Sequence, residues 1–237
     1  MTVVLTIFAI GALIALHELG HLWAARRVGL PVKRFSIGMG PILYRRQARG
    51  IEWAISAIPF GGYVLFDAED PAYGQAPPLA HIFTSAAGPL ANVLVAGVLF
   101  VAAASLDAGA FALADGLNRA GASLGSVFDV LGMLFSGQVG VGDLAGPVHM
   151  VSQGADLAGR PSVFLGYVAF ISLDLAVLNL LPIPSLDGGR ILMTAYEALT
   201  DKRLPQGAQL LLLGTSSLLL VGLMVWVMVQ DVVRLFS

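Results

Sequence analysis

The chain has 237 residues, of which 57% are hydrophobic and only 12% are charged, and its formal net charge is −2. An average soluble domain carries about 25% charged residues, so this composition, with a mean hydropathy of +0.83, predicts an integral membrane protein. The small net charge and the lack of a dense basic run exclude nucleic acid as a partner, and the absence of cysteine excludes disulfides and thiolate metal sites. Any metal must therefore be held by His, Asp, Glu or water.

The first apolar segment, residues 3–25, is long enough to cross a bilayer and contains His17, Glu18 and His21. No basic residue precedes it and ionisable residues interrupt it, so we predict a retained membrane helix and not a cleaved signal peptide. A charged side chain at the centre of a membrane helix costs roughly 2.5 to 3.5 kcal/mol, so these clustered ionisable groups indicate a function.

Residues 33–65 are rich in β-branched and aromatic residues, with glycine and proline between them, which predicts short strands. The stretch is too apolar for a solvated loop, and open sheet edges are not tolerated against lipid. We therefore expect a membrane-dipping β-hairpin that packs on the helices or lines a cavity. Residues 67–80 contain acidic residues, proline and glycine, and are expected to form a cytoplasmic linker.

Three further segments reach spanning length, at 84–104, 163–181 and 210–229. The segment 106–162 contains no uninterrupted span, and residues 126–135 within it fit a helix on the membrane surface. The chain is thus predicted to be an all-α polytopic membrane protein, with about four transmembrane helices and a small β-hairpin in one membrane-embedded domain.

Basic residues follow the first span and recur between the third and fourth spans, whereas the segment 106–162 holds few. They are Arg26, Arg27, Lys33, Arg34, Arg45, Arg46, Arg49, Arg190, Lys202 and Arg203. The positive-inside rule places residues 26–80 in the cytoplasm and both termini outside, for a multi-pass protein of the cell membrane.

The pattern His17-Glu18-Leu19-Gly20-His21 carries the chemistry. Residues i and i+4 share one face of a helix, so both imidazoles can hold one metal ion while Glu18 faces its water. This arrangement is typical of a zinc hydrolase, with one zinc ion per chain.

A catalytic zinc site takes three protein ligands and leaves one open position, so a third ligand is needed. Asp187 is the best candidate, because it follows the third span on the same membrane side as His21. Pro182 and Pro184 interrupt the helix and free backbone groups near the site. Those groups and the side chain of Asn179 are candidates for hydrogen bonding to an extended substrate.

These residues and several other segments resemble the site-2 protease family of intramembrane zinc metalloproteases, and most closely its bacterial RseP-like branch. The matching segments follow one another in order over nearly the whole chain, at 17–21, 35–40, 58–63, 87–92, 146–147 and 179–189. The resemblance implies His17, His21 and Asp187 as zinc ligands and Glu18 as the catalytic carboxylate. It also implies that the hairpin, including Gly61 and Gly62, adds the unwound substrate as a strand.

The chain departs from that pattern at two places. The segment 106–162 has no room for the PDZ domains of RseP-like proteins, so an unidentified regulatory partner is an open expectation. Asp174 stands where the related sequences have Asn, and its role is open.

The leading hypothesis is an intramembrane zinc metalloendopeptidase that cleaves transmembrane helices of single-span, membrane-anchored proteins within the lipid bilayer. One alternative is a metal or proton transporter that uses the site residues and Asp174 as a relay, although the internal repeats of such transporters are absent from the sequence. A second alternative is an inactive scaffold.

Overall fold

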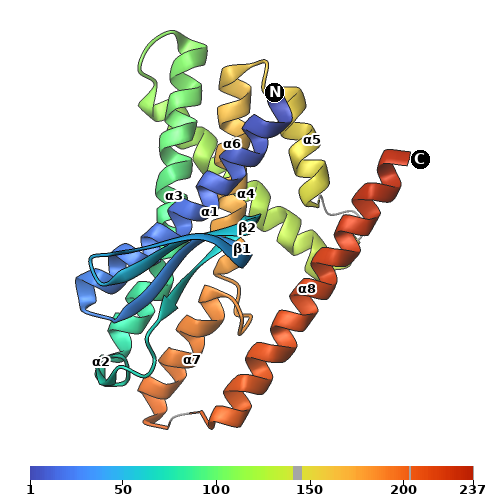
Figure 1. The fold of residues 1–237 in the computed structure, drawn as a ribbon. Helices are drawn as coiled ribbons and strands as arrows, with labels where there is room; N and C mark the ends of the chain where they lie inside the picture. Colours follow the sequence, from blue (N-terminus) through green and yellow to red (C-terminus); the bar gives the residue numbers. More distant parts are fainter. Residues whose placement is uncertain (141–145, 203, 237) are drawn as a thin grey trace. The chain divides into compact units, whose positions relative to one another are not determined.

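The computed structural model describes residues 1–140, 146–202 and 204–236, with the backbone alone at 59, 60, 135, 235 and 236. Arg203 and the part of the expected extracytoplasmic segment at 141–145 lie outside the described residues. The structure is mostly helical, with one pair of strands after the first helix (Figure 1). The elements are α1 (Thr2–Val28), β1 (Val32–Ala48), β2 (Ile51–Phe66), α2 (Pro71–Gln75), α3 (Pro78–Ala108), α4 (Leu113–Phe135), α5 (Pro147–Leu157), α6 (Pro161–Asn179), α7 (Asp187–Thr200) and α8 (Gln206–Phe236).

Four of these helices are long and apolar enough to cross a membrane, and they are α1, α3, α6 and α8. Only 11% of the most apolar window of α8 is buried within the protein, which is the pattern of a helix that faces lipid. The predicted fold class, a helical multi-pass membrane protein with a small sheet after the first helix, is confirmed. The helix α3 begins at Pro78, six residues before the expected span, because proline is favoured in the first helical turn.

The chain divides into two compact units. The hairpin unit contains Ile10–Asn92 and Leu175–Leu210, and the helical unit contains Met1–Ala9, Val93–Asp174 and Leu211–Ser237.

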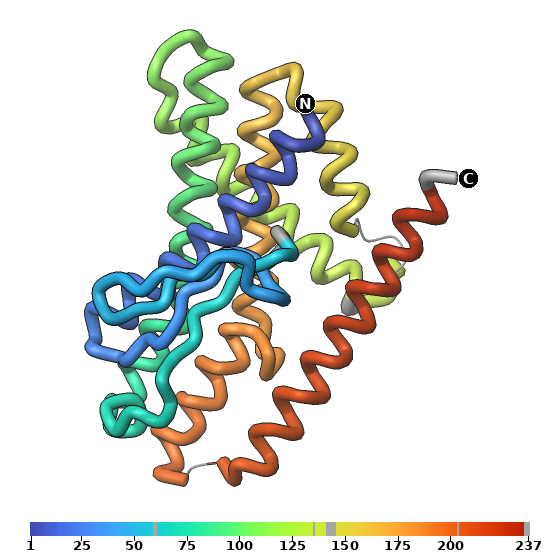
Figure 2. The backbone as a smooth tube through the Cα atoms, viewed as in Figure 1, coloured from blue at the N-terminus to red at the C-terminus, as the bar shows by residue number. Residues whose placement is uncertain are grey.

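The sheet of the hairpin unit consists of two long antiparallel strands that bend back on themselves (Figure 2). Phe35 in β1 lies opposite Val64 in one direction and opposite Trp53 in the other. The first part of β1 is therefore an interior strand, whereas the end of β2, from Gly62 to Phe66, pairs within the described part of the chain with β1 along one side only.

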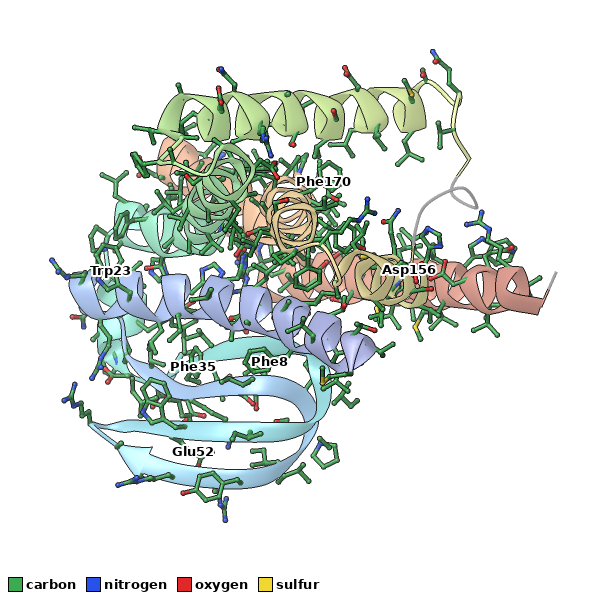
Figure 3. All side chains as sticks on the ribbon, turned by 90° about the horizontal axis from the view of Figure 1, so that it is seen from above. Phe8, Trp23, Phe35, Glu52, Asp156 and Phe170 are labelled. Carbon is green, nitrogen blue, oxygen red and sulfur yellow. The ribbon has the colours of Figure 1, made fainter. Side chains whose placement is uncertain are left out.

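An apolar core fixes the sheet to the helix that precedes it. Leu22 of α1, Phe35 of β1 and Ile51 of β2 are each at most 4% exposed, and the rings of Phe35 and Trp53 lie 5.1 Å apart. Figure 3 shows Phe35 between the sheet and α1. The apolar stretch thus packs on a helix, as its composition predicts.

The helical unit has its own core, where Ala96 and Phe100 of α3 pack on Ala169 and Leu173 of α6. Within this unit, Asp231 of α8 is 3% exposed and accepts hydrogen bonds from the backbone N–H groups of Gly146 (3.2 Å) and His149 (2.9 Å). A carboxylate at a helix N-terminus satisfies N–H groups that have no partner within the helix. Asp231 therefore connects α8 to the start of α5.

Candidate metal centre

Three side chains of the hairpin unit converge on one point. His17 and His21 lie one turn apart on α1, and Asp187 is the first residue of α7. The Nε2 atoms of His17 and His21 are 3.1 Å apart, and Oδ2 of Asp187 is 3.1 Å from the former and 3.3 Å from the latter. The predicted third ligand is therefore brought to the two imidazoles, across 170 residues of sequence.

The three atoms fit a zinc ion. Zinc lies about 2.0 to 2.2 Å from nitrogen and oxygen ligands, so two ligands of a tetrahedral site lie about 3.3 Å apart. All three measured separations are close to this value, and all three residues are buried. The charge also fits, because a buried carboxylate and two imidazole nitrogens that face one another at 3.1 Å form a site for a cation.

A hydrogen bond from outside the ligand set orients His21. Its Nδ1 atom donates to the backbone carbonyl of Thr84 in α3, over 2.7 Å. Donation through Nδ1 leaves the lone pair of Nε2 directed at the site, which is the usual arrangement for a metal-binding histidine.

Glycine lets α3 lie against the imidazoles. A Cβ atom on Gly88 would lie 2.5 Å from Cε1 of His21 and 2.7 Å from Nε2 of His17. A Cβ atom on Gly20 would lie 2.5 Å from the carbonyl oxygen of Ala87, so α1 and α3 are almost in backbone contact here. The imidazoles are therefore held between α1 and α3. A larger residue at Gly20 or Gly88 would keep these two helices from approaching so closely.

The turn between α6 and α7 positions Asp187. A Cβ atom on Gly188 would lie 2.5 Å from the carbonyl oxygen of Leu181, and one on Gly189 would lie 2.6 Å from Cα of Pro184. The proline-containing turn thus folds tightly onto the start of α7, as the Pro and Gly pattern predicts.

The electrostatics of the site keep Asp187 ionised. Burial by itself would raise the pKa of this carboxyl, but in the metal-free protein the hydrogen bonds from His17 and His21 in their protonated forms outweigh burial and lower the pKa from 3.8 to about 2. At neutral pH the group is therefore a carboxylate, the form that binds a metal.

Glu18 lies beside the three converging side chains, and all four line a hollow of about 250 Å³. A Cβ atom on Gly62 would lie 3.0 Å from Cγ of Glu18, so the end of β2 touches the side chain of the predicted catalytic residue. The remaining lining residues come from three parts of the hairpin unit, and they are Gly62, Tyr63, Val64, Phe66, Thr84, Ser85, Asn179, Ser185, Leu186 and Arg190.

Two of the four predicted substrate-binding residues line the hollow, and two do not. Asn179 and Gly62 line it, although the Nδ2 atom of Asn179 donates to the carbonyl of Leu175 in its own helix. Gly61 and Pro182 are not among the lining residues, and Gly61 instead lies against Met39 of β1. Asp174 belongs to the helical unit and is not among the lining residues either.

Sequence reasoning missed two polar residues of the hollow that carry local signals. Arg190 follows Asp187 by three residues on α7, a spacing that places both on one helix face. Ser85 precedes Pro89 by four residues within α3, and the missing N–H of proline removes the intrahelical donor for the Ser85 carbonyl.

Two histidines and one aspartate that fit a zinc ion, with a glutamate beside them, define a metallohydrolase site, and the helix that carries three of these residues is long enough to cross a membrane. The sequence model of Peptidase family M50 matches residues 5–223. The chain belongs to this family, and it is a zinc metalloprotease.

The chain is similar to several bacterial proteins. It is 25% identical to the "Putative zinc metalloprotease all3971" of Nostoc sp., over 99% of this chain and 97% of the other. It is also 25% identical to the "Putative zinc metalloprotease Cj1068" of Campylobacter jejuni, over 98% and 93%. A shorter match, to "Metalloprotease MmpA" of Caulobacter vibrioides, is 33% identical over 40% of this chain and 31% of the other.

Proposed function

We propose that this protein is an intramembrane zinc endopeptidase that cleaves the transmembrane helices of single-span membrane proteins, as in regulated intramembrane proteolysis. The observation that carries the proposal is the convergence of His17, His21 and Asp187 at 3.1 to 3.3 Å, two of them within a helix of spanning length. His17, His21 and Asp187 would hold the metal.

A zinc ion in such a site supplies a Lewis acid and lowers the pKa of a water molecule at its open coordination position. Glu18 lines the same hollow as the ligands, so its carboxylate accepts a proton from the attacking water and later donates it to the leaving amine. Burial of the site between α1 and α3 limits the water that reaches these groups.

The end of β2 offers a binding site for the substrate backbone. Residues from Gly62 to Phe66 pair with β1 on one side only, and four of them line the hollow. A peptide bond in a helix is shielded by its own hydrogen bonds, so a substrate must unwind, and the free edge of β2 would replace the lost bonds by strand addition. Asn179, which also lines the hollow, would contribute a further hydrogen bond.

The orientation in the membrane is part of the proposal. The positive-inside rule supports an active site toward the cytoplasm, with both termini outside the cell. We also propose that the protein belongs to an RseP-like branch without a PDZ domain. The alignment with the Nostoc protein extends over 353 positions, more than the 237 residues of this chain, so it contains gaps opposite this chain. A separate regulatory partner would then select substrates by size.

The test is co-reconstitution of the purified protein in liposomes with a panel of single-span substrates, with bound zinc measured in parallel. We expect cleavage within the substrate span by the wild type, loss of cleavage with a chelator and its return with zinc. Glu18→Gln should bind zinc without cleavage. Cleavage outside the membrane span, or equal cleavage by Glu18→Gln, would contradict the proposal.

A further inference from the structure

A second hollow of the hairpin unit, of about 450 Å³, lies where α1 ends, away from the metal ligands. It is formed by the residues after α1, the turn that joins β1 to β2, and the segment before α2. Leu30 and Ile51, each 4% exposed, form its apolar floor. Its volume lies within the range of about 300 to 1,000 Å³ that is typical of small-ligand sites.

Charges of both signs line this hollow. Arg26, Lys33 and Arg49 are basic, and Asp67 and Asp70 are acidic. Among the described residues, none of these five side chains forms an ion pair, although they share one hollow. Groups of opposite sign that face a common space without pairing can each bind part of one ligand that itself carries both charges.

The backbone of Arg49 adopts a positive φ angle, which is uncommon for a residue with a long side chain. Arg49 and Gly50 form the turn between the strands, with φ of 53° and 78°, and such a two-residue turn requires positive φ at both positions. Asparagine is the favoured residue at the first of them, whereas a long side chain there is strained. Nη2 of Arg26 donates to the carbonyl of Arg49, over 3.4 Å. An unfavourable backbone conformation at a residue beside a charged hollow points to a function for its side chain.

The end of α1 that borders the hollow carries residues typical of a membrane surface. Trp23, one turn before Arg26 on α1, is 54% exposed, and the guanidinium of Arg27 lies 5.1 Å from the centre of its ring. Tryptophan and arginine at the end of a spanning helix mark the headgroup region of the bilayer. A charged hollow at such a position favours a lipid headgroup as its ligand.

We propose that this hollow binds the headgroup of a phospholipid that carries both a phosphate and a primary ammonium, the chemistry of phosphatidylethanolamine. The phosphate lies against Arg26, Lys33 and Arg49, and the ammonium lies against Asp67 and Asp70. Asp70 also accepts a hydrogen bond from the N–H of Ala72 through Oδ1, which leaves its second carboxylate oxygen to accept from the ammonium. A lipid bound here would hold the hairpin turn at the membrane surface.

The test is native mass spectrometry of the full chain in detergent, titrated separately with phosphatidylethanolamine, phosphatidylglycerol and phosphatidylcholine. The key variant is Arg49→Asn, which suits the turn and keeps the carbonyl that Arg26 binds, so its thermal stability should not fall below that of the wild type. Arg46→Gln is the matched control, because it removes the same charge from an exposed position of β1 outside the hollow.

We expect phosphatidylethanolamine to bind most tightly, and Arg49→Asn to weaken it about fivefold, the effect of one basic residue near a membrane surface. Arg46→Gln should leave it unchanged. Asp67→Asn should weaken phosphatidylethanolamine but not phosphatidylglycerol. Equal losses in Arg49→Asn and Arg46→Gln, or tighter binding of phosphatidylglycerol, would show diffuse attraction and overturn the proposal. Equally tight binding of soluble glycerophosphoethanolamine would overturn the assignment to a lipid.

Discussion

The substitution Gly88→Ala tests whether close approach of α3 to the imidazoles creates the metal site. The added Cβ atom would lie 2.5 Å from Cε1 of His21, whereas carbon atoms in contact lie about 3.5 to 4.0 Å apart, so an imidazole must move by roughly 1 Å. A displacement of that size costs on the order of 100-fold in rate, or about 2.7 kcal/mol of activation free energy.

The assay combines zinc content, thermal unfolding and the rate of cleavage of a single-span substrate in liposomes. Gly97→Ala is the matched control, because it makes the same change in α3 where, among the described residues, nothing beyond its own stretch of helix lies within 4 Å of the new Cβ atom. Both substitutions gain up to about 1 kcal/mol in helix propensity, whereas only Gly88→Ala adds a steric clash, so the thermal unfolding measurement shows whether a lost site reflects a general loss of stability. Full zinc content and a wild-type rate for Gly88→Ala would refute the reasoning.

Three further changes separate the parts of the protein. Gly62→Val should lower the cleavage rate at least tenfold with zinc retained, because its Cβ atom would lie 3.0 Å from Cγ of Glu18 and 3.0 Å from the carbonyl oxygen of Ser36, while the ligands come from the helices; loss of zinc would contradict this expectation. Asp187→Asn should abolish zinc binding. In metal-free protein the pKa of Asp187 is lowered from 3.8 to about 2, so its stabilising effect is present above about pH 4 and is lost as the pH falls toward 2. Thermal unfolding of metal-free wild type and Asp187→Asn should therefore differ most between about pH 4 and 6, where histidine is still protonated, and should converge as the pH falls toward 2, and a difference that grows on acidification below pH 4 would be inconsistent with this. Asp231→Ala removes the acceptor of two backbone hydrogen bonds and should cost about 1 to 3 kcal/mol of unfolding free energy with zinc content unchanged; equal stability of the variant and the wild type would argue against a capping role.

The sequence by itself determined the features that depend on neighbouring residues. Apolar length predicts the four spans, because a bilayer has a fixed thickness. The spacing of His17 and His21 predicts their shared helix face, because the pitch of a helix is fixed. The same kind of local reasoning predicted Asp187 as the third ligand, because the prolines and glycines around it indicate a turn at the end of a span.

The tertiary structure alone decided which distant surfaces meet. Gly88 lies against the imidazoles, and the Thr84 carbonyl accepts from His21, because α3 packs on α1 at a depth that no local pattern specifies. The free edge at Gly62, and not Gly61, reaches Glu18, since a shift of one residue along a strand turns every side chain to the other face. The charged hollow at Arg49 and the contact of Asp231 with α5 likewise join segments far apart in sequence. Such contacts depend on packing between elements, which residue type and spacing do not encode locally.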